Sequence, residues 1–237
     1  MFRTRSVARN LTASALRVPG SARSSDNAPL IQTLGVRTTE RTTGDIGPPN
    51  QHFRFSADGH TYTDVDGRAI PHITELLERA GWLDTLWMTE ESRERGTAIH
   101  RLTAAYDLGG LDMAAVPDPY RAYLLAYQTA RVSLRASWAE IEVPHVHPVL
   151  RFGGRPDRVG TAFGLRTVLE IKTGDPHKSH PIQLALQSLL VATPSGLPAE
   201  HYQRLCLYLK SSGKFSLKIP DQRSDYDKAR KIVRDCC

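Results

Sequence analysis

Between residues 73 and 138, the spacing of hydrophobic residues predicts three helices. Apolar positions recur every three or four residues between 73 and 80, and Gly81 is expected to end this first helix. Thr89 is a favourable N-cap for a second helix that runs through Tyr106. A third helix is expected to follow Pro119 and to reach Trp138, because tyrosine and leucine side chains keep the same period there.

Short turns and a change of period predict strands on both sides of these helices. The Asp-Gly pairs at 58–59 and 66–67 predict small hairpins before the first helix. After the third helix the apolar positions alternate with polar ones, which is typical of strands joined by glycine turns. Three successive strands are expected at 140–151, 155–163 and 166–172.

The end of the chain predicts a helix, a hairpin and a second helix. Leucines at helical spacing indicate a helix over 178–193. The apolar runs 205–210 and 214–219 flank a Ser-Ser-Gly turn, which indicates a hairpin. A charged helix is expected over 222–235. This order of elements predicts an α/β fold, in which helices pack on one mixed sheet.

Residues 51–237 are predicted to form one globular domain, whereas residues 1–50 are predicted to form a disordered basic tail. The tail is rich in Ser, Thr, Arg, Gly and Pro and has no sustained apolar period. It carries most of the net charge of +6, so any DNA-binding surface on the domain has to be local. The arginine-rich residues 1–25 also fit a transit peptide; a flexible tail or an upstream extension of the reading frame are the alternatives.

Composition excludes several classes of protein. No run of about 18 apolar residues is present, so we expect no membrane span. The three cysteines, Cys206, Cys236 and Cys237, form no Cys-x-x-Cys pair, so neither a disulfide framework nor a zinc site is predicted. An iron–sulfur cluster requires about four cysteine ligands and is not expected either.

The segment 153–174 carries the chemistry that the sequence predicts. Asp157 lies early in one expected strand, and Glu170 and Lys172 lie two residues apart near the end of the next. Side chains at positions i and i+2 of a strand point to the same face, so Glu170 and Lys172 project together. If the two strands form a hairpin, the Asp157 carboxylate joins them.

Two carboxylates and a lysine at one place indicate a metal site, because buried charges are costly unless they are paired or bind a metal. Carboxylate oxygens suit Mg²⁺ or Mn²⁺, which lower the pKa of a bound water and polarise a phosphodiester. The lysine then orients the water or stabilises charge on the phosphate. No organic cofactor is needed. Taken alone, the same triplet also fits ordinary charges on a strand surface.

Four separated motifs resemble the RecB-like branch of the PD-(D/E)XK nucleases, which includes phage-type and genome-maintenance exonucleases. The segments GRPDRVG and TVLEIKTG carry the paired carboxylates and the lysine. The helix with IQLALQSLL follows them, and RGTAIH at 95–100 is similar to the upstream Gly-Thr-x-x-His element of that branch. The resemblance spans roughly residues 70–210. It implies a restriction-endonuclease-like core with a central mixed sheet flanked by helices and an N-terminal helical part.

The resemblance also implies a role for individual residues. Asp157 and Glu170 are expected to hold Mg²⁺ or Mn²⁺, with the Ile171 carbonyl and His100 as further ligands. Lys172 is the expected catalytic lysine, and Glu142 is expected to bind a second ion or to position water. For His100 the alternative is a hydrogen-bonded boundary histidine, and for Glu142 a solvent-facing strand residue.

Contacts to DNA are expected from a helix and from nearby arginines. Gln183 is expected to contact the DNA backbone or brace the site. Gln187, four residues later, is also expected to contact DNA. The branch often has a tyrosine at this position, which leaves the role of Gln187 open. Further expected phosphate contacts, with ordinary surface charges as the alternative, are Arg95, Arg155 and Arg158.

The resulting hypothesis is a Mg²⁺-dependent DNA exonuclease that acts in recombination, repair or phage DNA processing. An endonuclease on the same core and a catalytically silent module that binds DNA or protein are the alternatives. DNA is the expected partner. The protein is expected to be cytoplasmic and encoded by a bacterium or phage, or mitochondrial if residues 1–25 act as a transit peptide.

Overall fold

A computed structural model describes residues 53–57, 61–83 and 89–237. The predicted basic tail at 1–50, its proposed transit peptide and the Asp-Gly turn at 58–59 lie outside the described residues. Among the described residues, no helix is long and apolar enough to cross a membrane.

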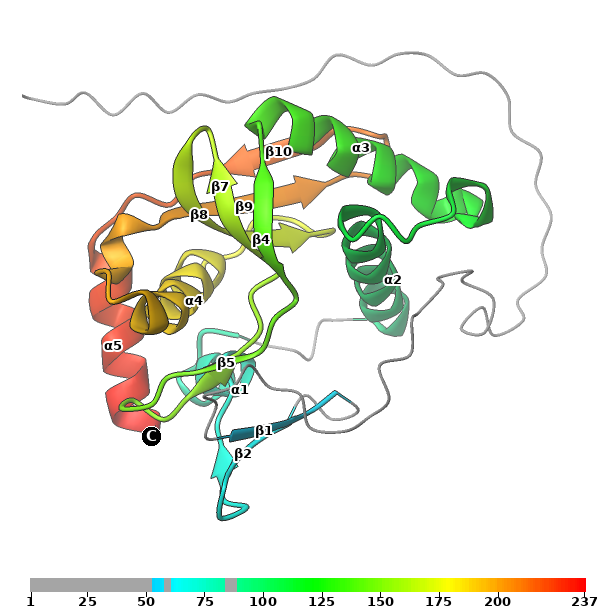
Figure 1. The fold of residues 1–237 in the computed structure, drawn as a ribbon. Helices are drawn as coiled ribbons and strands as arrows, with labels where there is room; N and C mark the ends of the chain where they lie inside the picture. The colour runs from blue at the N-terminus through cyan, green and yellow to red at the C-terminus, as the bar shows by residue number, and fades with distance from the viewer. Residues whose placement is uncertain (1–52, 58–60, 84–88) are drawn as a thin grey trace, which may run out of the picture.

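A five-stranded mixed sheet forms the centre of the protein (Figure 1). Its strand order is β10-β9-β8-β7-β4. Neighbours are antiparallel except β8 and β9, which are parallel and are joined through helix α4. The strands are β4 (Ser137–Ile141), β7 (Arg158–Ala162), β8 (Leu165–Lys172), β9 (Gln203–Leu209) and β10 (Phe215–Lys218).

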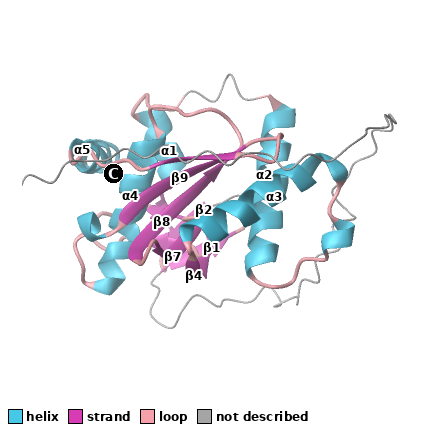
Figure 2. Ribbon diagram, turned by 90° about the horizontal axis from the view of Figure 1, so that it is seen from above, coloured by secondary structure: helices cyan, strands magenta, loops and turns pink. Residues whose placement is uncertain are grey.

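Helices cover both faces of this sheet, as the view from above shows (Figure 2). The helices on one face are α1 (Ile73–Arg79), α4 (His180–Ser195) and α5 (Ser224–Cys236). Those on the other face are α2 (Glu90–Asp107) and α3 (Asp118–Leu134). The protein is therefore a mixed α/β fold with a central sheet flanked by helices, as the sequence predicted.

The side chains of β8 alternate between the two hydrophobic cores, one on each face of the sheet. Val168 packs against α4 and α5, whereas its neighbours Leu169 and Ile171 pack against α2 and α3. All three side chains are fully buried. Because each face of the strand is covered, apolar residues occupy consecutive positions, and the charged Glu170 is placed on the α4 side.

Helix and hairpin boundaries follow local signals. The Thr89 side chain accepts a hydrogen bond from the Ser92 amide, which caps α2. Phe163 and Gly164 form the two-residue turn between β7 and β8, and both have positive φ, 54° and 78°. That conformation fits the twist of a tight hairpin, and glycine adopts it without strain.

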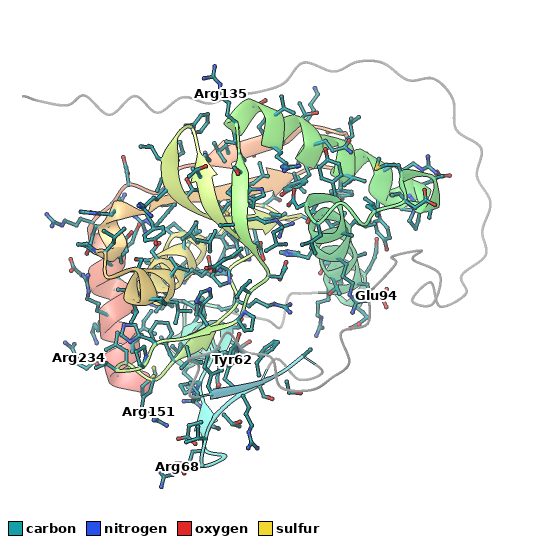
Figure 3. The ribbon with its side chains drawn as sticks, in the orientation of Figure 1. Tyr62, Arg68, Glu94, Arg135, Arg151 and Arg234 are labelled. Carbon is teal, nitrogen blue, oxygen red and sulfur yellow. The ribbon has the colours of Figure 1, made fainter. Side chains whose placement is uncertain are left out.

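Two smaller sheets lie below the central one in Figure 1. The first has the order β1-β2-β3, with β1 (Phe53–Ser56), β2 (Thr61–Asp64) and β3 (Ala69–Ile70). The second pairs β5 (His145–Val146) with β6 (Gly153–Gly154). Figure 3 shows Tyr62 between β2 and the body of the protein, where it is buried, whereas Arg68 projects outward.

The prediction of one long strand over 140–151 is wrong, and Trp138 is not on the third helix. Helix α3 ends at Leu134, where Arg135 adopts a left-handed conformation with φ of 49°, and Trp138 lies on β4. Strand β4 ends at Ile141, because Glu142 has a φ of 54° and Pro144 offers no amide to a ladder. Periodicity alone does not reveal these breaks.

Gly160 permits the close approach of β7 and β4. A Cβ atom at this position would lie 2.8 Å from the Trp138 Cα and still closer to the Ser137 carbonyl oxygen. We expect Gly160→Ala to lower the free energy of unfolding by about 2–3 kcal/mol, because backbone atoms cannot rotate away as a side chain can. Urea unfolding followed by circular dichroism measures this loss.

Gly110→Ala is the matched control, since a Cβ there meets no atom within 4 Å. It is expected to change stability by less than about 1 kcal/mol. Equal effects of the two substitutions would contradict the close approach of the strands.

Candidate active site

Asp157 and Glu170 are brought to neighbouring positions by the hairpin of β7 and β8. The register pairs Arg158 with Leu169, and one step further along the same register Asp157 is opposite Glu170. Both carboxylic residues are buried, with 5% and 3% of their surface exposed. Such burial distinguishes them from ordinary charges on a strand surface, so compensating groups must be close.

One oxygen of Asp157 is bound to the backbone of the neighbouring strand. Asp157 Oδ2 accepts a hydrogen bond of 2.6 Å from the Ile171 amide. Pro156 has no amide hydrogen, and the β7 ladder begins only at Arg158. The Asp157 carboxylate therefore binds the Ile171 amide in place of a backbone group of β7, and this bond fixes the orientation of the carboxylate.

The other oxygen of Asp157 faces a histidine and a second carboxylate. His100 Nδ1 on α2 lies 3.1 Å from Asp157 Oδ1 and 3.5 Å from Glu142 Oε1. The possible ligand atoms of these three residues all lie within 4.8 Å of one another. Glu142 follows β4, has a φ of 54° and donates its amide to the Asp157 carbonyl. Its left-handed backbone thus directs the carboxylate to this group.

The two carboxylates of this group require a compensating positive charge. Burial by itself lowers the pKa of His100, but the carboxylates of Asp157 and Glu142 outweigh it and raise that pKa to about 10. The protonated imidazole supplies the compensating charge here. A divalent cation bound by the same atoms would supply that charge in its place.

Glu170 is held by a separate set of donors. Glu170 Oε1 accepts hydrogen bonds from Lys172 Nζ at 2.7 Å and from Gln183 Nε2 at 2.6 Å. Glu170 Oε2 accepts one from Gln187 Nε2 at 2.6 Å. Glu170 is not one of the three residues that converge on His100, so the structure groups Glu142, rather than Glu170, with Asp157 as a potential metal ligand.

Lys172 is charged and anchored. Burial lowers its pKa, while the carboxylates of Glu170 and then Asp157 raise it by more, so that its pKa lies above the ordinary value. Its Nζ also donates to Gln183 Oε1 at 3.1 Å. A quarter of the side chain remains exposed. The ammonium group is therefore both fixed and accessible from outside.

The buried position of Arg158 does not suit the phosphate contact predicted for it. Its side chain is fully buried, and its Nε donates to Asp107 Oδ2 at 2.6 Å. Its NH1 donates to the Asp157 carbonyl at 2.6 Å. Tyr127 also donates to Asp107. Arg158 thus braces the backbone of Asp157 from behind.

Gln187 is likewise too deeply buried for the DNA contact predicted for it, with 2% of its surface exposed. Gln183 is half-buried, and it lines a cavity of about 70 Å³ together with Tyr62, Arg155 and Gln187. Arg155 forms an ion pair of 3.1 Å with Glu142. Of the residues predicted to contact DNA, Gln183, Gln187 and Arg155 therefore line this cavity, although little of the Gln187 surface is exposed.

Arg95 lies near the site without a partner within the described residues. Its Nε is buried and forms no hydrogen bond. The next residue, Gly96, approaches the end of β8, since a Cβ there would lie 4.0 Å from Thr173 Oγ1. The Gly-Thr-x-x-His element thus places α2 against the end of the strand that carries Lys172.

The sequence analysis did not identify Asp107 as part of the site. Asp107, with His100 and Thr103, lies on the face of α2 turned toward β7, and polar residues at this spacing on a buried face were the available signal. His145 is also buried, and its Nε2 lies 2.7 Å from Glu140 Oε2.

No family model and no curated protein sequence matches the chain. The geometry of the site and the mixed α/β fold are therefore the basis for a function.

Asp107 compensates the buried charge of Arg158, so its removal should be costly. Its side chain is 1% exposed and also lies 3.3 Å from Arg131 Nε. We expect Asp107→Ala to lower the free energy of unfolding by about 3–5 kcal/mol, because the buried Arg158 would lose its closest counter-charge and keep only the Glu142 carboxylate at 3.7 Å. Thermal or urea unfolding measures the effect.

Asp66→Ala serves as the control for this prediction. Asp66 forms a 3.8 Å ion pair with Arg68 in which both side chains are well exposed. Solvent screens such a pair, so stability should hardly change. An Asp107 variant as stable as this control would show that Arg158 does not depend on Asp107.

Proposed function

We propose that this chain is a divalent-metal-dependent deoxyribonuclease with a restriction-endonuclease-like core, and that it acts as an exonuclease. The observation that supports the proposal most is the convergence of His100, Glu142 and Asp157 beside the Lys172–Glu170 pair. These groups come from α2, from the segments that flank β4 and β7, and from β8. Such a convergence of charged groups from distant parts of the chain is typical of a functional site.

The donor set fits Mg²⁺ or Mn²⁺. His100, Glu142 and Asp157 offer one imidazole nitrogen and two carboxylates, and Glu142 Oε1 is buried without a hydrogen-bond partner. A cation would satisfy that oxygen and relieve the repulsion between the buried Asp157 and the partly buried Glu142 carboxylates. When bound, such an ion activates a water molecule and polarises the phosphodiester.

Glu170 and Lys172 have a different part in the proposed reaction. The Lys172 ammonium is held beside Glu170 by its ion pair and by Gln183, so it can face the scissile phosphate without reorganising. It then stabilises the negative charge that develops on the phosphate oxygens. Glu170 keeps the ammonium in place and joins the metal ligands only if it releases a bond to Gln183 or Gln187.

The three arginines at the site also have different roles. Arg95 has no partner within the described residues and lies on α2 close to the end of β8, which suits a phosphate of the bound strand. Arg155 compensates Glu142 and borders the cavity beside Gln183. Arg158 supports the backbone of Asp157 and does not face DNA.

The activity of two variants tests the proposal. Lys172→Gln and Asp157→Asn are each expected to lower Mg²⁺-dependent cleavage of DNA by about 10²–10³-fold or more, because each removes a charge that the reaction needs. Lys210→Gln is the matched control, since Lys210 forms an exposed ion pair with Asp175 at 3.0 Å. It should cleave at the wild-type rate.

The assay uses end-labelled DNA with Mg²⁺ or with EDTA, and circular dichroism verifies that the variants are folded. Wild-type rates in both site variants would remove the proposed nuclease function. So would the absence of any metal-dependent cleavage by the wild-type protein.

Linear and closed circular DNA distinguish the two modes of cleavage. An exonuclease is expected to degrade linear DNA and to leave closed circles intact, because it requires an end. Gel electrophoresis of both substrates with Mg²⁺ measures this. Nicking or linearisation of the circles would favour the endonuclease alternative.

A further inference from the structure

Two lysines share the ring of Trp82 on the surface. Lys178 Nζ lies 5.9 Å from the ring centroid of Trp82, and Lys228 Nζ lies 5.8 Å from it. Trp82 follows α1, Lys178 precedes α4 and Lys228 lies on α5. The fold therefore gathers these three residues from distant parts of the chain. We call them the Trp82 surface.

The charge of this surface is uncompensated. Both lysine side chains are exposed, and neither has an ion pair with a carboxylate in the part of the chain that the structure describes. The nearby Asp175 is occupied by Lys210, and the buried Asp225 by Arg204. Two like charges attracted to one aromatic ring raise the local positive potential, which favours an anion.

The half-buried indole gives this surface its rigidity. Trp82 packs against the core formed by α1, α4 and α5. Attraction to a fixed ring restricts the long lysine side chains, so less conformational freedom is lost when they bind a phosphate. Because two ammonium groups lie within 6 Å of the ring centroid, phosphate contact suits the surface better than base stacking.

The Trp82 surface is connected to the candidate active site by a short segment. Lys178 belongs to the loop that leaves β8 directly after Lys172 and leads into α4. At the end of that loop, His180 binds Tyr208, and burial together with the Lys172 ammonium lowers the pKa of His180 to about 4. The loop thus extends from the catalytic lysine to the Trp82 surface.

We propose that Trp82, Lys178 and Lys228 bind backbone phosphates of the DNA strand that extends beyond the active site. This inference rests on the proposed nuclease function and specifies where the substrate lies. A nucleic-acid strand supplies closely spaced negative charges, and lysines that contact its phosphates release bound counterions. The surface should therefore bind without sequence preference.

A salt titration of DNA binding tests the proposal. Anisotropy of a labelled oligonucleotide, single-stranded in one arm and duplex in the other, is measured with the full chain in EDTA at several KCl concentrations. EDTA prevents cleavage. The variants are Lys178→Gln, Lys228→Gln and the double variant. The control is Lys218→Gln, an exposed lysine of β10 without a partner in the described part of the chain.

We expect each single substitution to reduce the slope of log affinity against log salt by about 0.7 for single strands or about 0.9 for duplex DNA. The double variant should lose about twice as much, and the control should keep the wild-type slope. The arm with the larger change identifies the form of DNA that reaches the surface.

Three outcomes would overturn the proposal. If wild-type protein binds DNA and the three variants keep its slope, the Trp82 surface does not contact the strand, although the nuclease function stands. If the Lys218 control loses as much as the variants, binding is diffuse rather than local. If wild-type protein neither binds nor cleaves DNA, both proposals fail together.

Discussion

The Asp157 carboxylate is the contact on which the candidate site depends. One of its oxygens binds the Ile171 amide on β8, and the other faces His100 on α2. A single side chain thus joins two strands and the helix that covers them. If this carboxylate lost its charge, the hydrogen bond to β8 would weaken, and His100 would lose its nearest counter-charge.

A set of compensated charges surrounds this contact. Arg158 supports the Asp157 carbonyl and is itself neutralised by Asp107, while Arg155 neutralises Glu142. Lys172 neutralises Glu170. Buried charges persist only with such partners, so the site behaves as one electrostatic unit in which removal of one member affects the others. The positive charge of the protonated His100 is the one that a metal ion would replace, with the neutral imidazole as a ligand.

Much of the fold could be predicted from the sequence, because period and turn residues are local signals. The alternation along β8 predicted that Glu170 and Lys172 share a face opposite Ile171, and the glycine turn predicted the hairpin that brings Asp157 beside them. The end of β4 was missed, because the left-handed backbone of Glu142 is set by tertiary contacts rather than by its residue type.

The site, like the fold, could be predicted only in part from the sequence. Motif spacing indicated Asp157, His100 and Lys172, whereas burial decides the roles of the arginines and glutamines, and spacing does not reveal burial. Arg155 and Arg158 are separated by two residues, yet one borders a cavity and the other is fully enclosed. The partner of Arg158 lies on another helix, 51 residues away in the chain.

Calorimetric titration of the metal-free protein with Mn²⁺ tests directly whether the cluster around Asp157 binds a divalent cation. We expect saturable binding by the wild-type protein, with release of a proton that His100 gives up as the ion enters. Asp157→Asn should weaken this binding by about 100-fold or more, since it removes a ligand charge. Equal affinity of the two proteins, or no binding by the wild type, would contradict a metal site at Asp157.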